Sequence, residues 1–288
     1  MEIKIDFYND WINNIKEQMT QWGYAVDPTD DQQTLAINYF HILERQIEPI
    51  PRTVLISKEL SCPPQYQSAF HTIRKKAEEG GDLVPHLSKQ ILNSNYQDQL
   101  LNDWGIHHLH LGNSIDHTGF IERTGPLLFA RITESEFFAI AILNHGAWTD
   151  RSLLQIIYNN WPKSISQYLL KNMRLTQEAT PDEHRKLRAA GVCVLTSLDD
   201  GTVCMPIGGG VTTAKTGVHS IMEHDHYAHL ITHLENVTKQ QAELLVETCK
   251  QQNIQLPPNL HFQLVLENSD FIAQEIHTGL LIKVGQLP

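Results

Sequence analysis

The stretch from Asp103 to Trp161 decides the fold of this chain. It reads DWGIHHLHLG (103–112), GPLLFARI (125–132), EFFAIAILNHG (136–146) and AWTDRSLLQIIYNNW (147–161), with a polar loop after the first segment. Short apolar runs bounded by glycine and polar residues are typical of strands, and the last segment has the apolar spacing of a helix. We therefore expect three strands and a closing helix.

This stretch also contains five of the sixteen histidines of the chain. Successive side chains of a strand point to opposite sides. His108 and His110 therefore share one face, whereas His107 lies with Leu109 and Leu111 on the other. The two leucines mark the second face as the core side. We expect His108 and His110 to project together from the open face.

The second and third segments predict a β-hairpin. Leu127–Ile132 and Phe137–Leu143 are separated by the short polar turn TESE. Both faces of the second strand are apolar, which is typical of a central strand that is covered on both sides. Asp150 stands where a helix cap is expected, directly before the closing helix.

Composition narrows the class of protein. No apolar run approaches the roughly 18 residues of a membrane span, and the N-terminus lacks the pattern of a secretory signal. The four cysteines form no CxxC pair, as expected of reduced thiols, so we expect a cytoplasmic protein without a membrane partner. The formal net charge of −11 disfavours a broad nucleic-acid surface but is compatible with a small local basic site.

The rest of the sequence predicts further helices and strands. Apolar spacing predicts helices over 2–23, 31–46, 67–79, 82–102, 219–237 and 239–253. Strands are expected at 53–60, in a hairpin of 191–198 with 202–207, and in a C-terminal meander over 260–285 that joins this hairpin in one antiparallel sheet. The composition becomes more polar after Pro162, which indicates a boundary between residues 1–165 and 166–288.

The predicted fold class is α+β. Helices of the N-terminal segment are expected to pack on the antiparallel histidine-containing sheet, and a second, smaller α+β unit with antiparallel strands follows. The predicted helix 219–237 has a row of histidines, which are His224, His226, His229 and His233. A solvated polar face is the favoured interpretation of this row, although Asp225 and His229 have a spacing that can chelate a metal ion.

The order LLFARI–TESE–FFAIAILNHGAWTDRSLLQII (127–157) resembles the C-terminal sheet of RelE/HigB-like ribonuclease toxins. That family often shows an arginine-containing strand, a next strand that ends in a histidine-containing turn, and an acidic helix start. The chain departs from the family in its length, its acidic composition and its large C-terminal part. Over about residues 103–161, the resemblance implies a metal-independent endoribonuclease of toxin or phage-defence type, with RNA as a partner and no cofactor.

Such chemistry gives roles to four residues. Cleavage of RNA through its 2′-hydroxyl needs a base, an acid and a cation near the phosphate, and histidine and arginine are suited to these tasks. His108 or His110 is then the base, His145 the acid and Arg131 the phosphate clamp. The alternative is structural: surface histidines on a strand, and an arginine that pairs with a nearby carboxylate.

Two other functions fit the same sequence. One is a non-enzymatic interaction protein whose acidic surface binds a basic protein partner. The other is a metal-dependent hydrolase in which His108 and His110 hold an ion with a third ligand such as His145, His117 or Asp116. Cleavage of RNA that survives EDTA and is lost in His110→Ala or Arg131→Ala distinguishes the ribonuclease from both. The sequence leaves the oligomeric state open.

Overall fold

The computed structural model of the protein describes residues 2–267 and 270–286. The chain divides into two compact units, Met1–Tyr39 with Met222–Pro288, and Phe40–Ile221. We call them the terminal unit and the central unit and describe each by itself. Both combine helices with a sheet, so the predicted α+β class is confirmed. Within the described ranges, no helix is long and apolar enough to cross a membrane.

A four-stranded sheet with the order β2-β5-β4-β3 forms the middle of the central unit. The hairpin is as predicted: β4 (Pro126–Ile132) runs antiparallel to β5 (Glu136–Asn144). β3 (Ile106–His110) pairs antiparallel with the other edge of β4, and β2 (Thr53–Ile56) pairs parallel with β5. The sheet is therefore mixed rather than purely antiparallel, and β5 lies inside it.

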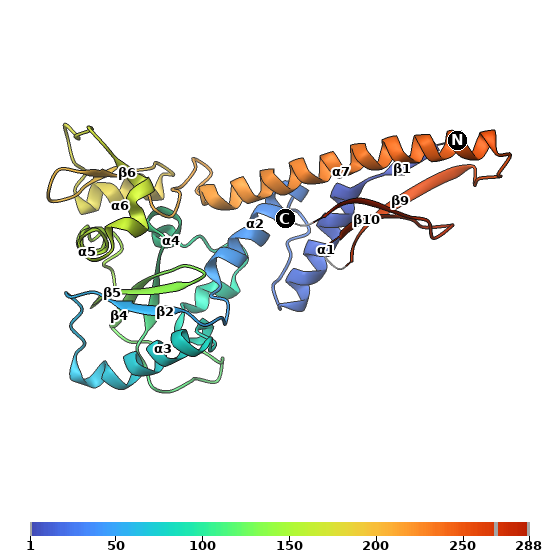
Figure 1. Ribbon diagram of the computed structural model, residues 1–288. Helices are drawn as coiled ribbons and strands as arrows, with labels where there is room; N and C mark the ends of the chain where they lie inside the picture. The colour runs from blue at the N-terminus through green and yellow to red at the C-terminus, as the bar shows by residue number, and fades with distance from the viewer. Residues whose placement is uncertain (1, 268–269, 287–288) are drawn as a thin grey trace. The chain divides into compact units, whose positions relative to one another are not determined.

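Helices cover both faces of this sheet (Figure 1). α3 (Gln67–Glu79) packs on one face and buries Ala69, Ile73 and Ala77, which recur every four residues as one face of a helix requires. On the other face, the core includes residues of α4 (Gln99–Trp104) and α5 (Ser152–Asn160). Each fully buried leucine or isoleucine in these layers contributes roughly 1.5–3 kcal/mol.

The expectation of an open face on β3 is wrong. Leu109 packs in the core on the α3 side, and Ile106 packs with Phe129 in the core on the opposite side. As a result, His110 is 2% exposed, and only 12% of the His108 side chain is accessible. Covering both faces of the edge strand explains why His110 is buried and why His108 is largely covered.

Short elements complete the central unit. The segment expected to be helical over 82–102 contains two 3-10 turns, η2 (Val84–His86) and η3 (Lys89–Leu92), before α4 begins. A further 3-10 turn, η1 (Pro64–Tyr66), precedes α3. α6 (Pro181–Ala189) begins with a capping box in which the side chains and backbones of Thr180 and Glu183 bond reciprocally.

The expected boundary near residue 165 differs from the division seen in the structure. Residue 165 lies in the 3-10 segment η4 (Pro162–Tyr168), and Ile165 is fully buried in one core with Leu198 and Cys204. The predicted hairpin of 191–207 is reduced to two-residue strands, in a small sheet of β6 (Leu169–Leu170), β8 (Val203–Cys204) and β7 (Thr196–Ser197). Packing therefore continues across the polar segment that indicated a boundary.

The terminal unit contains a second four-stranded sheet, with the order β1-β9-β10-β11. The C-terminal meander is as expected, with β9 (Asn259–Glu267), β10 (Asp270–Glu275) and β11 (Leu281–Gln286). Its further partner is β1 (Glu2–Ile5), which pairs parallel with β9, and not the predicted hairpin. The expected helix over 2–23 therefore begins only at Phe7, after the cap residue Asp6, as α1 (Phe7–Gln21).

One long helix replaces two predicted ones. α7 (Val218–Gln251) runs for 34 residues without a break. The predicted interruption between Val237 and Lys239 is wrong, because Thr238 is fully buried and its hydroxyl donates to the Leu234 carbonyl at 2.8 Å within the helix. α7 packs with α1 on the terminal sheet through apolar residues such as Leu234 and Phe262. The predicted helix at 31–46 is present as α2 (Gln32–Arg45).

Candidate functional site

A pocket of about 340 Å³ lies beside the histidine strand of the central unit. Its lining combines acid–base groups, cations and an aromatic ring: Asp98, His108, Arg123, His145, Trp148, Arg185 and Arg188. Two of the four predicted site residues, His108 and His145, therefore line one pocket. Concave sites with convergent polar groups are the usual places for ligand binding.

The hairpin register explains why His145 and Arg123 are neighbours. Pro126 at the start of β4 is opposite Asn144 at the end of β5. The residues that precede β4 therefore lie beside the residue that follows β5, and His145 N donates to the Gly125 carbonyl at 2.9 Å. His108 reaches the same region from the adjacent strand, where it is opposite Phe129.

Trp148 is the common neighbour of the two histidines. Its ring centroid lies 4.7 Å from that of His108 and 5.0 Å from that of His145, and it also contacts Phe129 at 5.7 Å. The indole thus fixes both imidazoles against one apolar surface. Low polarity at this surface strengthens electrostatic interactions between the groups that line the pocket.

His108 is held in the neutral form. Burial disfavours its charged form and lowers its pKa, and nearby His145 and Arg123 act in the same direction, whereas Asp98 opposes them. The Asp98 Oδ2 atom lies 3.7 Å from His108 Nδ1, beyond hydrogen-bond length. Within the described residues, this buried nitrogen has no hydrogen-bond partner. A neutral imidazole in a pocket can accept a proton from a ligand.

The carboxylate beside His108 is fixed by the helix that follows it. Asp98 is the cap residue of α4, and its Oδ1 accepts from the backbone N–H groups of Leu100 and Leu101, both at 3.1 Å. The other carboxylate oxygen of Asp98, Oδ2, faces the His108 imidazole. Capping therefore positions a negative charge next to His108.

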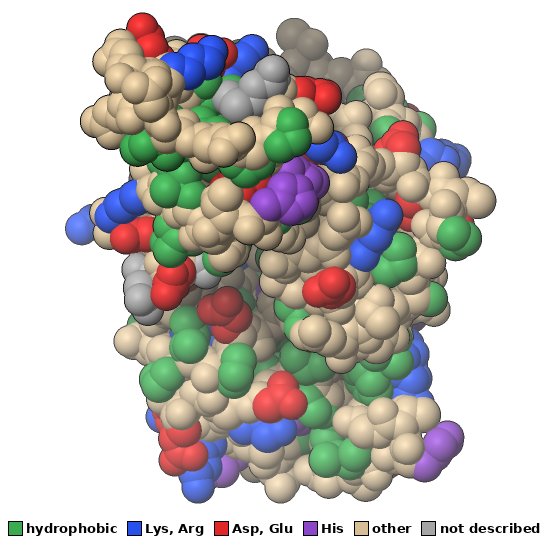
Figure 2. All heavy atoms as spheres, turned by 90° about the vertical axis from the view of Figure 1, so that its right-hand side faces the viewer, with side chains coloured by type: hydrophobic (Ala, Val, Ile, Leu, Met, Phe, Trp, Pro, Cys, Tyr) green, Lys and Arg blue, Asp and Glu red, His purple; other side chains and the backbone are tan. Residues whose placement is uncertain are grey.

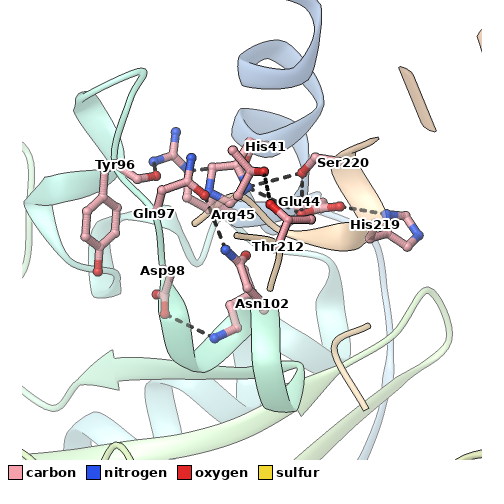
Figure 3. A network of polar contacts seen from close by, with 12 residues as sticks. His41, Glu44, Arg45, Tyr96, Gln97, Asp98, Asn102, Thr212, His219 and Ser220 are labelled. Atoms are coloured by element: carbon pink, nitrogen blue, oxygen red, sulfur yellow. Dashed lines mark hydrogen bonds and ion pairs between the residues drawn. The ribbon is translucent and has the colours of Figure 1, made fainter. Parts of the chain in front are cut away.

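Arg45 anchors the pocket wall that contains Tyr96 and Asp98 (Figure 3). This arginine is 2% exposed. It donates to the carbonyls of Asn93 at 3.1 Å, Ser94 at 3.4 Å and Tyr96, and its guanidinium lies 5.5 Å from the Tyr96 ring centroid. One side chain at the end of α2 therefore orders the loop that precedes the Asp98 cap.

A Ser–His–Glu group lies next to Arg45 but does not have the geometry of a catalytic triad (Figure 3). His41 Nδ1 is 3.2 Å from Ser220 Oγ and 3.5 Å from Glu44 Oε2, and Ser220 also donates to Glu44 at 2.9 Å. A triad places its hydroxyl and carboxylate on opposite ring nitrogens. Burial opposes ionisation of Glu44, yet its bonds with His219 and His41 outweigh this and lower its pKa to about 2.

A buried network of charged residues holds the backbone of Trp148 in place. Asp103 Oδ2 is 2.8 Å from His184 Nε2 and accepts from Arg188 Nε at 2.7 Å, and all three residues are at most 2% exposed. Arg188 also donates to the Trp148 carbonyl at 2.6 Å, and its guanidinium stacks 4.8 Å above the Trp104 ring. Arg188 thus holds the backbone of the residue that both histidines contact.

His110 and Arg131 do not join this group. His110 Nδ1 accepts from Thr124 N at 3.3 Å, and burial, reinforced by the charge of Arg123, lowers its pKa to about 4. It therefore supports the loop that contains Arg123. The Arg131 guanidinium lies 5.7 Å from the Phe138 ring centroid, on the β5 side of its strand, and burial lowers its pKa.

Asp98, Arg123 and Trp148 were missed by sequence reasoning. The predicted hairpin could have indicated Arg123, because pairing of Pro126 with Asn144 places residues 123–125 beside His145. Asp98 and Trp148 lie in loops that no periodicity positions. As for a metal centre, no group of three or more histidine, cysteine or acidic residues is arranged to hold an ion in the part of the chain that the structure describes.

A larger cavity of about 790 Å³ lies near the start of α5. Its lining includes the carboxylates of Glu59, Asp150 and Asp199, and no histidine among the described residues. These charges repel an anionic substrate, and the cavity brings no acid–base pair together. The smaller histidine pocket is therefore the better candidate for chemistry.

No protein-family model, curated protein or solved structure matches the chain. The geometry and charge of the pocket are therefore the features from which a function can be inferred.

Proposed function

We propose that the protein is a metal-independent endoribonuclease-like enzyme of toxin or phage-defence type, with His108 and His145 as its acid–base pair. The observation that carries this proposal is the pair of histidines on Trp148, one largely covered and one exposed, in a pocket with arginines. Two histidines in different environments suit a reaction that needs a base and an acid at the same time.

His108 is the base in this proposal. Its lowered pKa keeps it neutral near pH 7, so that it can take the proton of the ribose 2′-hydroxyl. The 2′-oxygen then attacks phosphorus and forms a 2′,3′-cyclic phosphate as the bond to the 5′-oxygen breaks. His145, which is exposed, donates a proton to that departing oxygen.

Arg123 replaces Arg131 as the cation nearest the reacting phosphate. It is exposed, lines the pocket and has no ion pair within the described residues, whereas Arg185 is paired with Asp182. Guanidinium groups can hold a phosphate with two donors. On the face shown in Figure 2, basic side chains are scattered among acidic and uncharged ones and form no broad basic surface.

The test is RNA cleavage by the purified protein in EDTA. We expect cleavage by the wild type and its loss in His108→Ala and in His145→Ala, with His117→Ala, which removes an exposed histidine that does not line the pocket, as the control. Growth on overexpression gives a second readout: the wild type should be toxic and the two pocket variants harmless. Equal growth and equal cleavage in wild type and variants would remove the basis of the proposal.

A non-enzymatic interaction protein is the second candidate, and the net charge of −11 favours it. It predicts no cleavage under any condition and a stable basic partner in a pull-down. A metal-dependent hydrolase that uses His108 with His110 predicts activity that EDTA abolishes. The same assay, run with and without EDTA, therefore separates the three functions.

A further inference from the structure

The geometry of α7 points to a metal site in the terminal unit, apart from the pocket. We infer that His229 and His233 form a two-histidine site for a borderline divalent cation such as Ni²⁺, Cu²⁺ or Zn²⁺. Neutral imidazole is a preferred ligand of these ions. The inference does not rest on the proposed ribonuclease activity.

The two histidines have the spacing of a helical chelate. In the segment HLITH (229–233) they stand four residues apart in an unbroken α-helix, so they lie on one face in successive turns. Residues at this spacing have Cβ atoms about 5–6 Å apart, which allows both imidazoles to reach one ion at about 2.0–2.1 Å. The same spacing provides two zinc ligands in the HExxH helix of metalloproteases.

Packing fixes this face toward solvent. On the opposite side of the same turns, Ile231 is 4% exposed and Leu234 is 1% exposed in the core of the terminal unit. Rotation of the helix about its axis is therefore prevented, while His229 and His233 are both exposed. Neither side chain has a hydrogen bond or ion pair within the described residues, so no existing contact has to break when an ion binds.

The local charge favours a cation. Asp225 lies one turn before His229, and 57% of its side chain is accessible. It cannot serve as a third ligand together with His233, because eight residues of helix separate the two by about 12 Å. Among the described residues, no three-ligand group is present here, so water completes the coordination of the ion. Two ligands imply binding of moderate strength.

His226 provides a matched control on the same helix. It is exposed like the proposed ligands, but its ring makes an edge contact with Tyr227 at 5.7 Å between centroids. It stands three residues before His229 and seven before His233, so it is a neighbour of His229 but cannot share an ion with His233. Removing it takes away one surface histidine while leaving the chelating pair intact.

The experiment is an isothermal titration of the full-length, untagged protein with NiCl₂ near neutral pH, in which calorimetry measures the binding. His229→Ala should weaken this binding roughly tenfold or more, since His226 and His233 then stand seven residues apart and neither has a partner in the next turn. His233→Ala should weaken it as well, since it removes the partner at the four-residue spacing. His226→Ala should bind like the wild type, and so should His108→Ala, which tests the pocket as the source of the signal. Binding should also weaken on acidification, because protons compete for the imidazoles.

Two results would overturn the inference: unchanged Ni²⁺ affinity in both His229→Ala and His233→Ala, or an equal loss in His226→Ala. Circular dichroism of each variant checks that α7 remains folded. Because the readout is binding, failure of the ribonuclease proposal would leave this test intact.

Discussion

β3 and α7 are both rich in histidine, yet His107 and His110 of β3 are buried, whereas His229 and His233 of α7 are exposed. On β3, His107 is 7% exposed and His110 is 2% exposed, and burial lowers the pKa of each to about 4. On α7, His229 and His233 face solvent. A count of histidines therefore carries little information about function until their burial is known, because desolvation favours the neutral form.

The comparison also separates two ways of using the residue. A buried imidazole beside a carboxylate and an aromatic ring, such as His108, has a defined direction and a defined protonation state. An exposed pair on a helix has no defined direction until a ligand orders it. Acid–base chemistry needs the first arrangement, and chelation is compatible with the second.

The largest expected effect is on catalysis. His108→Ala should reduce the rate of RNA cleavage about 10²–10⁴-fold, the usual contribution of a general acid or base. His233→Ala, which removes a histidine of α7, should leave the rate unchanged. Initial rates on a fluorescent RNA measure both, and a similar loss in the two variants would end the distinction between the two regions.

Removal of the buried carboxylate should have the largest effect on stability. Asp103→Ala leaves Arg188 and His184 without their shared partner in the core, and we expect a loss of about 3–5 kcal/mol. Asp225→Ala removes the 2.9 Å contact between an exposed carboxylate and His224 Nδ1. This change should cost less than about 1 kcal/mol. Urea unfolding of both variants makes the comparison, and equal losses would contradict it.

Acidification should destabilise the fold through the β3 histidines. The pKa of His107 and that of His110 are about 4 in the folded protein, against about 6.5 for an exposed histidine. Between these values the unfolded chain binds protons that the folded chain does not. The free energy of unfolding should therefore fall as the pH drops, by roughly 1.4 kcal/mol per pH unit for each histidine.

The variant that tests this source of pH dependence is His110→Gln, whose amide oxygen can still accept from Thr124 N. Its unfolding free energy should fall less steeply than that of the wild type between neutral pH and pH of about 4. His226→Gln on α7 should keep the wild-type slope. Parallel curves for wild type and His110→Gln would show that the buried imidazole is not responsible.

The smallest expected effect concerns the exposed histidines themselves. His229→Ala and His233→Ala should change the unfolding free energy by no more than about 0.5 kcal/mol in the absence of metal, as is usual for surface positions. Thermal unfolding in EDTA measures this directly. A larger loss would mean that these side chains have a structural role, which their exposure argues against.

Apolar spacing and turn residues in the sequence correctly predicted the hairpin and the end of α3, because these features depend on residues that are close in sequence. The hairpin of β4 and β5 follows from apolar runs around TESE, and α3 ends at Gly80, whose φ of 75° suits glycine. The continuity of α7 was missed because a polar stretch around Thr238 resembles a break, although no glycine or proline interrupts it.

Contacts between distant segments explain the remaining differences. β1 pairs with β9 across more than 250 residues, and Asp103 meets Arg188 at a separation of 85. Neither contact leaves a periodic signal. The candidate site shows the same limit: strand alternation grouped His108 with His110, but only the packing of Trp148 and the Arg45-anchored loop distinguishes the pocket residue from the buried one.

The most direct test of the central claim, that His108 and His145 act on the ribose 2′-hydroxyl, is analysis of the product ends. A short RNA with a mapped cut site should be incubated with the protein in EDTA, next to the same RNA with a single 2′-deoxy residue before that site. We predict a 2′,3′-cyclic phosphate end on the first RNA and no cut at the modified site. Equal cleavage of both, or no cleavage of either, would contradict the account.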